Sequence, residues 1–337
     1  MLRTVHGLLW LIIFICLSDC QLISQTDDFL PDLSGPYLGQ TPPGSEPEVF
    51  APGIVSTGLY ERDLTMTPEG DEIYYCTVLG NYDHAVIVGT RQIKGKWTRP
   101  EIMPFAADPG YMYIEPHISP DGNRFFYVSN QPDSVGAPPM QTEDIWVMNR
   151  TENGWGAPAR LPAPVNTIHA EYFPTLTKGG TLYFTRRKVD EKWDAIYRSV
   201  WIDGAWTEPE RLGKTVNAGT ARFNAFVDPD ERFLIVPVLG LQDSRGSVDY
   251  YVCFRDENDI WTGPFNLGNA VNTQGGLEFS PYISPDGRYF FFMSRRLEPR
   301  EGKLSLSDLK KWNQEPRNGN PDIYWMDASF IGQLKSK

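Results

Sequence analysis

The sequence predicts an all-β protein, a five-bladed β-propeller of four-stranded antiparallel blades, and three observations carry this prediction. A Pro-Asp-Gly phrase recurs along the chain, an aromatic or apolar run follows every copy, and an Asp-led strand comes next in each unit. The 337 residues include 30 Gly, 28 Pro and 13% aromatic residues, a composition typical of short strands joined by tight turns. Because 41% of the residues are hydrophobic and 22% are charged, wholesale disorder is excluded.

The first twenty residues differ in character from the rest of the chain. Residues 8–17 form an apolar run that is too short to span a bilayer core of about 30 Å but fits an export signal. Residues 17–20 resemble a bacterial lipoprotein cleavage box, although Asp19 is atypical before the cysteine. Two alternatives stay open, lipidation of Cys20 or simple cleavage near it. The predicted parts of the chain are a signal peptide over residues 1–20, a flexible tether over residues 21–35 and a single propeller over residues 36–337.

Five copies of one phrase define the repeat. Full copies begin at positions 116 (PHISPDG) and 281 (PYISPDG), and degenerate copies begin at positions 64, 174 and 225, about 55 residues apart. In each unit, Gly and Asp supply the backbone conformations of a turn between two strands. An Asp then opens a third strand in every unit, at Asp83, Asp144, Asp194, Asp249 and Asp322.

The fourth strand explains how the ring closes. It carries a Trp followed three residues later by a Pro in the first four units, at Trp97, Trp155, Trp206 and Trp261. The fifth unit lacks this ending, but residues 47–56 match residues 209–217 in type and spacing. An N-terminal strand that completes the last blade would close the ring and remove exposed sheet edges. The sequence therefore predicts a closed propeller and not an open array.

The repeat resembles that of TolB-like, WD-like β-propellers of bacterial envelopes. The closest matches are the Ser-Pro-Asp-Gly turns with their aromatic runs at residues 119–127 and 284–295, together with Asp-Ile-Tyr at residues 322–324. The resemblance covers about residues 36–330, and three units depart from the full motif. It implies a periplasmic or surface propeller that binds proteins, and some relatives are polysaccharide lyases.

The first strand of each blade lines the channel of a propeller, so its variable positions are candidates for a functional mouth. One variable column holds Glu61, Tyr113, Glu171, Arg222 and Glu278, and the next holds Asp63, Glu115, Phe173, Asn224 and Ser280. If the protein is an enzyme, the candidate catalytic residues are Glu61, Glu171 and Glu278. The candidate ligand-binding residues are Glu115, His117, Arg186, Arg187, Arg222, Arg295 and Arg296. The structural alternative is that arginines ending the second strands pair with the repeated Asp of the third strand.

Cysteine and histidine usage points to no metal site and no cofactor. Cys76 and Cys253 remain after signal removal, each inside an apolar run, and two lone cysteines are predicted to be buried small residues without a disulfide framework. The mature chain has three histidines and no Cys-x-x-Cys motif, so a structural zinc site is not expected. Phosphate-binding and dinucleotide-binding glycine motifs are also missing from the sequence.

Charge and export together define the functional hypotheses. With 31 basic and 43 acidic residues the formal net charge is −12, which argues against a nucleic-acid partner. The signal predicts an exported protein, periplasmic or held at the cell envelope by a lipid. Our leading hypothesis is a monomeric binding module for an envelope protein or glycan. The alternative is a carbohydrate-active enzyme, a lyase or glycosidase, that uses channel-mouth carboxylates with support from Arg or His.

Overall fold

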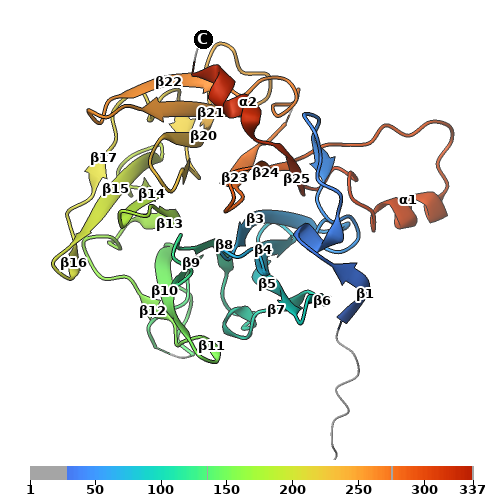
Figure 1. Ribbon diagram of the computed structural model, residues 1–337, viewed down its shortest axis with the longest axis horizontal. Helices are drawn as coiled ribbons and strands as arrows, with labels where there is room; N and C mark the ends of the chain where they lie inside the picture. The colour runs from blue at the N-terminus through green and yellow to red at the C-terminus, as the bar shows by residue number, and fades with distance from the viewer. Residues whose placement is uncertain (1–28, 135, 275, 336–337) are drawn as a thin grey trace, which may run out of the picture.

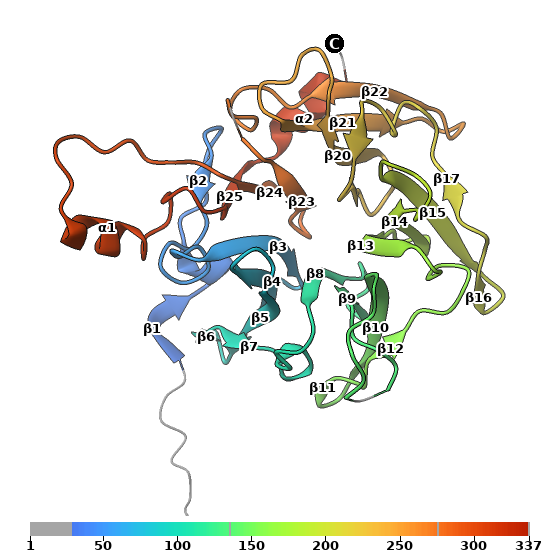
Figure 2. The same cartoon turned by 180° about the vertical axis from the view of Figure 1, so that it is seen from behind.

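Each repeat unit folds as a small antiparallel sheet, and five such sheets stand around a central axis like the blades of a propeller (Figure 1). The structure is a computed structural model that describes residues 29–134, 136–274 and 276–335. The same ring is seen from behind in Figure 2. The predicted all-β, five-bladed architecture is confirmed. The predicted signal peptide, with Cys20, lies outside the described residues.

In each blade the innermost strand lines the axis and the chain then steps outward. Blade one holds β3 (Tyr60–Met66), β4 (Glu72–Leu79), β5 (His84–Ile93), β6 (Lys96–Thr98) and β7 (Glu101–Ile102). Blade two holds β8 (Tyr113–Ile118), β9 (Arg124–Ser129), β10 (Asp144–Thr151), β11 (Gly154–Trp155) and β12 (Ala159–Arg160). Blade three holds β13 (Ala170–Leu176), β14 (Thr181–Arg187), β15 (Ala195–Ile202), β16 (Ala205–Trp206) and β17 (Glu210–Arg211). Blade four holds β18 (Ala221–Arg222), β19 (Phe226–Val227), β20 (Phe233–Leu239), β21 (Val248–Arg255) and β22 (Trp261–Asn266).

Blade five is built from both ends of the domain. Its inner strands are β23 (Phe279–Ile283), β24 (Tyr289–Ser294) and β25 (Asp322–Asp327), and its outer strand is the N-terminal β2 (Glu48–Val49). In the antiparallel register of β2 and β25, Glu48 lies opposite Trp325 and Val49 lies opposite Tyr324. The predicted closure of the ring by an N-terminal strand is therefore confirmed, and it covers the outer edge of β25.

The chain before β2 adds one strand that the sequence did not predict. β1 (Phe29–Ser34) pairs with β6 on the outside of blade one, within the range where we expected a flexible tether. Beyond it, the carbonyl of Gly35 accepts a hydrogen bond of 2.8 Å from the indole nitrogen of Trp97. A strand that pairs with an existing sheet edge is held mainly by backbone hydrogen bonds, which do not require particular side chains. Its sequence pattern is therefore weak.

All five innermost strands carry the same backbone irregularity. The residues at this position have positive φ angles between 49° and 70°, and they are Asp63, Glu115, Phe173, Asn224 and Ser280. The pairing register of four of these strands shifts across the same position, and in blade four the irregularity separates β18 from β19. Such β-bulges bend a strand and re-aim its side chains. Here they divide the channel into one zone beside the blade connections and one beside the first turns of the blades.

Neighbouring blades are joined around the axis by side chains that bond the next innermost strand. Thr65 accepts from the backbone N–H of Ile118, and Tyr282 accepts from that of Met66, both at 3.1 Å. Thr175 donates to the carbonyl of Ala225 at 3.2 Å. Between blades four and five a T-shaped contact of Phe226 and Tyr282 rings, 5.6 Å between centroids, takes this place. The ring is thus closed by polar and aromatic contacts as well as by β2.

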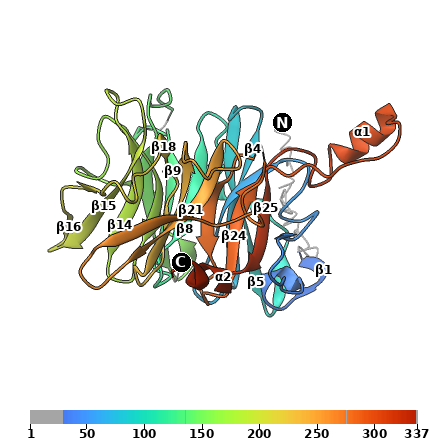
Figure 3. The same cartoon turned by 90° about the horizontal axis from the view of Figure 1, so that it is seen from above.

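Two helices and an extended arm complete the molecule. The arm joins β24 to β25 and carries α1 (Leu306–Trp312), which stands clear of the blades in Figures 1 and 3. Leu306 on this helix is 70% exposed. By contrast, α2 (Ser329–Leu334) buries Ile331 and Leu334. Among the described residues, no helix is long and apolar enough to cross a membrane.

Candidate functional site

The three candidate catalytic glutamates hold loops in place inside the protein. Glu61, Glu171 and Glu278 are at most 1% exposed. Each accepts hydrogen bonds from the backbone N–H and the hydroxyl of a threonine earlier in the chain, at Thr57, Thr167 and Thr273. Burial raises the pKa of Glu61 and of Glu278 to about 7 against these bonds, which lower it. The three carboxyls therefore clamp the loops that lead into the innermost strands, and none reaches solvent.

Arg222 occupies the equivalent position in blade four with inverted chemistry. Its loop has Ala218 where the others have Thr, so the hydroxyl donor is missing. The guanidinium instead donates to the carbonyls of Ala218 and Gly219, at 3.0 and 2.8 Å, and to that of Asp194 at 2.9 Å. Glu and Arg thus both hold the loop that precedes their strand. The glutamates accept from N–H and hydroxyl donors of the loop, whereas Arg222 donates to its carbonyl oxygens.

The remaining candidate arginines fall into two groups. Arg186 bonds Glu171 at 2.7 Å and the carbonyls of a blade connection, and Arg296 bonds the carbonyls of Ala270 and Val271. These two side chains face inward and stabilise loops. Arg187 lies half exposed, 3.3 Å from Glu143 and 4.0 Å from Asp194. Arg295 is exposed, and its Nε donates to the carbonyl of Gly319 at 3.1 Å. The expected pairing with the Asp of the third strand is seen in blade three, at Arg187 and Asp194.

Sequence reasoning missed a repeated amide that joins consecutive blades. Asn166, Asn217 and Asn272 each accept from a backbone N–H at the start of a third strand and donate back to the carbonyl of the same residue. Ser56 makes the matching pair with Ile323. The signal was present in the sequence as Val followed by Asn or Ser at four blade connections, with Val55, Val165, Val216 and Val271 fully buried.

The channel is closed at the end where the blade connections meet, here called the loop side. Arg62 forms ion pairs with Asp63 at 2.6 Å and with Glu115 at 3.0 Å, all three buried. Asn224 donates to the same Glu115 carboxylate at 3.2 Å, and Ser280 donates to Asp63. Burial raises the pKa of Glu115 to about 8, against the lowering influence of Arg62. The space beside this cluster measures about 10 Å³, room for a single water at most.

His117 belongs to the ring of contacts between blades. Its Nε2 accepts from the backbone N–H of Leu176 at 2.9 Å, in the same way as Thr65 accepts from Ile118. Burial lowers the pKa of His117 to about 3, so the imidazole is neutral and available as an acceptor. Within the part of the chain that the structure describes, no three His, Cys, Asp or Glu residues gather in a group that could hold a metal ion. Cys76 and Cys253 are free and buried, as predicted.

The opposite end of the channel, the turn side, opens into a funnel of about 330 Å³ that we call the turn-side funnel. Every blade contributes one rim residue from its first turn, namely Pro68, Pro120, Lys178, Pro229 and Pro285. Every blade also contributes one apolar residue below the rim, namely Met66, Ile118, Leu176, Val227 and Ile283. His117, Phe226 and Tyr282 reach the same space. The funnel is therefore a preformed depression on the propeller axis, with an apolar floor and with charged residues such as Asp230 and Arg232 also in its lining.

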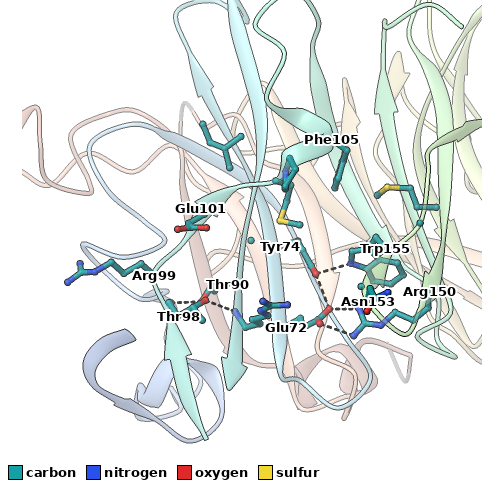
Figure 4. A pocket seen from close by; sticks show the side chains of 18 residues that line it. Glu72, Tyr74, Thr90, Thr98, Arg99, Glu101, Phe105, Arg150, Asn153 and Trp155 are labelled. Atoms are coloured by element: carbon teal, nitrogen blue, oxygen red, sulfur yellow. Dashed lines mark hydrogen bonds and ion pairs between the residues drawn. The ribbon is translucent and has the colours of Figure 1, made fainter. Parts of the chain in front are cut away.

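A second hollow lies on the outer part of the ring, between blades one and two, and we call it the seam cavity. It measures about 410 Å³ (Figure 4). Glu72 accepts two bonds from Arg150 at 2.7 and 2.8 Å, and the Tyr74 hydroxyl joins Glu72 to the indole nitrogen of Trp155. Figure 4 shows this network at one end of the cavity and Glu101 at the other. The turn-side funnel and the seam cavity are two candidate binding sites among the described residues.

Comparison with known proteins places the chain by its fold. No protein-family model and no curated protein sequence matches it. The structure resembles TolB from Acinetobacter baumannii, with 16% identity and a TM-score of 0.44, over 80% of this chain and 57% of that one. It also resembles an α-L-arabinofuranosidase from Lactobacillus brevis (11% identity, TM-score 0.47, 80% and 90% of the two chains). An arabinanase from Bacillus subtilis is similar at 15% identity and a TM-score of 0.47, over 84% and 99% of the two chains. The chain is thus a five-bladed β-propeller with distant structural similarity to TolB and to glycosidase propellers.

Proposed function

We propose that this protein is an exported, TolB-like binding module that takes an apolar segment of an envelope protein into the turn-side funnel. The observation that carries the proposal is the state of the polar side chains in the funnel. All of them already have a partner within the protein: Lys178 pairs with Asp230 at 2.9 Å and Arg232 with Asp228 at 2.7 Å. The others with internal partners are His117, Ser119, Tyr282, Ser284 and Asp286.

The chemistry of the partner follows from this inventory. A glycan binds mainly through hydroxyl groups, which bind best to polar side chains that have no other partner, and every polar side chain in the funnel already has one. An apolar side chain needs a dry, shaped depression and loses little by the lack of free polar groups. Four prolines at the rim restrict the backbone, so little conformational entropy is lost on binding. A protein segment with an exposed aromatic or aliphatic residue fits these conditions.

The enzyme alternative loses its support from the glutamates. General acid and base groups must reach the reacting atoms of a substrate. Glu61, Glu171 and Glu278 are buried and engaged by threonines, so they meet this condition at neither end of the channel. The Arg62 cluster also fills the loop-side end, where we had expected the channel mouth. No feature of the described residues favours catalysis over binding.

A defined peptide library tests the proposal. We expect panning of a displayed random-peptide library to select sequences with one invariant aromatic or aliphatic residue. These peptides should bind Pro285→Arg at least tenfold more weakly, because this substitution places a charged side chain at the funnel rim. Pro299→Arg, on the exposed arm beyond β24, is the matched control and should bind as the parent does. Equal binding to parent and Pro285→Arg would rule out the funnel as the site.

The exported location is part of the proposal and has its own test. The apolar run before Cys20 is the observation that supports it. Mass spectrometry of the mature protein should show an N-terminus at or near Cys20, and a diacylglyceryl-sized mass increase there would establish anchoring by lipid. An intact Met1 terminus on the mature chain would contradict export.

A further inference from the structure

We propose that the seam cavity between blades one and two is a second, independent binding site, and that its ligand is an acidic saccharide, one that carries a carboxylate or a sulfate. This site goes beyond the proposed function, since it lies on a different part of the ring and has a different chemistry. The proposal stands on the apolar floor of the cavity, on its unpaired polar side chains and on its charge.

The cavity lies beside one position in the third strand that lacks a side chain, Gly89. The equivalent second-strand residues of the five blades are Tyr74, Phe126, Tyr183, Ile235 and Phe291. The third-strand residues opposite them, which share the same face of the sheet, are Gly89, Val147, Arg198, Val252 and Trp325. In blade three Arg198 crosses the seam and bonds Asp259 of blade four at 2.9 and 2.6 Å. Blade one has Gly89 instead, so nothing from its third strand fills the corresponding space.

The space directly over Gly89 is occupied by side chains of neighbouring residues. A Cβ atom there would lie 2.6 Å from the sulfur of Met103 and 2.8 Å from the ring of Tyr74. Any larger residue would have to displace both side chains. The glycine therefore lets Met103 and Tyr74 approach the strand, and together with Phe105 and Trp155 they form an apolar floor that is partly exposed.

The polar side chains of the seam cavity differ from those of the funnel in one respect. Within the described residues, the side chains of Arg91, Arg99, Glu101 and Asn153 line the cavity without a hydrogen-bond or ion-pair partner. Exposed guanidinium, carboxylate and amide groups beside a partly exposed aromatic floor supply what a sugar ring requires. Its hydroxyls need planar donors and acceptors, and its C–H faces need an apolar surface.

The charged residues that line the seam cavity indicate which class of sugar it would bind. The ionisable lining comprises Arg91, Arg99 and Arg150 against Glu72 and Glu101, and Glu72 is already neutralised by Arg150. Two free guanidinium groups thus face one free carboxylate, on a chain whose net charge is −12. Arginine binds carboxylate and sulfate oxygens in a bidentate manner. An anionic sugar unit is therefore favoured over a neutral one.

Isothermal titration with defined oligosaccharides tests the proposal on the chain with Cys20→Ser, which removes any lipid. The probes are an oligogalacturonate, a sulfated chondroitin oligosaccharide and a neutral xylo-oligosaccharide. We expect one or both acidic probes to bind at least tenfold more tightly than the neutral one, and the better acidic probe shows whether carboxylate or sulfate is preferred.

Variants locate the binding. Arg91→Ala should weaken the acidic probe at least tenfold, about 1.4 kcal/mol. The control Arg245→Ala removes another exposed arginine that lacks a side-chain partner among the described residues, and it should have no effect. Pro285→Arg at the funnel should also leave saccharide binding unchanged, which separates this site from the proposed function. The proposal is overturned by an absence of acidic-saccharide binding, or by binding that survives both Arg91→Ala and Arg99→Ala.

Discussion

The amide that links consecutive blades offers the sharpest test of what stabilises the ring. The side chain of Asn166 is 4% exposed and makes three hydrogen bonds. It accepts from the N–H of Ile145 at 3.0 Å and donates to the carbonyls of Ile145 and Leu161, both at 2.8 Å. Asn166→Ala removes all three bonds. Because Asn166 lies in the connection between β12 and β13, the strands themselves are unchanged.

The expected loss in the free energy of unfolding depends on which backbone groups lose their only hydrogen-bond partner. The Ile145 carbonyl still accepts from the N–H of Leu161 at 3.0 Å, so its loss is small. The N–H of Ile145, in a fully buried residue, is left without an acceptor, which costs about 1–3 kcal/mol. Adding about 1 kcal/mol for the other lost bonds, we expect Asn166→Ala to lower the free energy of unfolding by about 3 kcal/mol.

Urea unfolding followed by tryptophan fluorescence measures this change. Asn166→Asp is the informative second variant: it keeps an acceptor for the Ile145 N–H but directs a carboxylate at two carbonyls, so it should destabilise at least as much as alanine. Asn149→Ala, on the exposed face of the same blade, is the control and should change stability by less than about 0.5 kcal/mol. If Asn166→Ala matched this control, the linking role of the amide would be refuted.

Three further changes probe closure, buried charge and the ring around the axis. Phe50→Ala, which removes a ring 5.3 Å from that of Trp325 beside the closing strand, should cost about 3–5 kcal/mol in urea unfolding; a loss below about 1 kcal/mol would contradict closure by this segment. The pKa of Glu278 is raised from 4.5 to about 7, so its contribution to stability is present below pH 4.5 and is lost as pH rises through 7. Glu278→Gln should therefore reduce the fall in unfolding free energy between pH 5 and pH 8 by roughly 3 kcal/mol, and an unchanged slope would exclude a buried titrating carboxyl. His117→Phe leaves the N–H of Leu176 without its acceptor and should cost about 1–3 kcal/mol at pH 7. Because the pKa of His117 is lowered to about 3, its contribution is present above pH 6.5 and is lost as pH falls toward 3, so the cost should shrink in thermal melts at pH 4.

The architecture could be predicted because repetition makes weak local signals add up. One Pro-Asp-Gly turn indicates a hairpin, whereas five at an even spacing indicate a ring, and the match of residues 47–56 to an internal segment located the closing strand. β1 could not be found in this way, since it occurs once and pairs through its backbone. The arm with α1 is also unique to one blade, so no other copy of the repeat reveals it.

The candidate site was less predictable because one residue type serves two purposes. A column of glutamates on innermost strands looks the same whether it faces a substrate or clamps a loop. The partners that decide between these uses, such as Thr57 for Glu61, stand only four residues earlier, but their role emerges only when the loop is folded. The floor of the seam cavity depends on one small residue, Gly89, opposite Tyr74, because only a glycine there allows Met103 and Tyr74 to approach the strand. The importance of this glycine can be recognised only from the strand register, which shows that Gly89 in blade one occupies the position of Arg198 in blade three.

The shared last blade imposes an order on folding. Apart from β1, the strands of blades one to four pair with strands of the same repeat unit, whereas Val49 must pair with Tyr324 across almost the whole domain. Such distant pairing is slow, because the entropy of closing the long loop is lost before the contact stabilises anything. During synthesis the ring stays open until β25 has been made. A chain halted before residue 322 would expose the unpaired backbone groups of both β24 and β2, because the strand that pairs with them would be missing. A chaperone would be needed most at this stage.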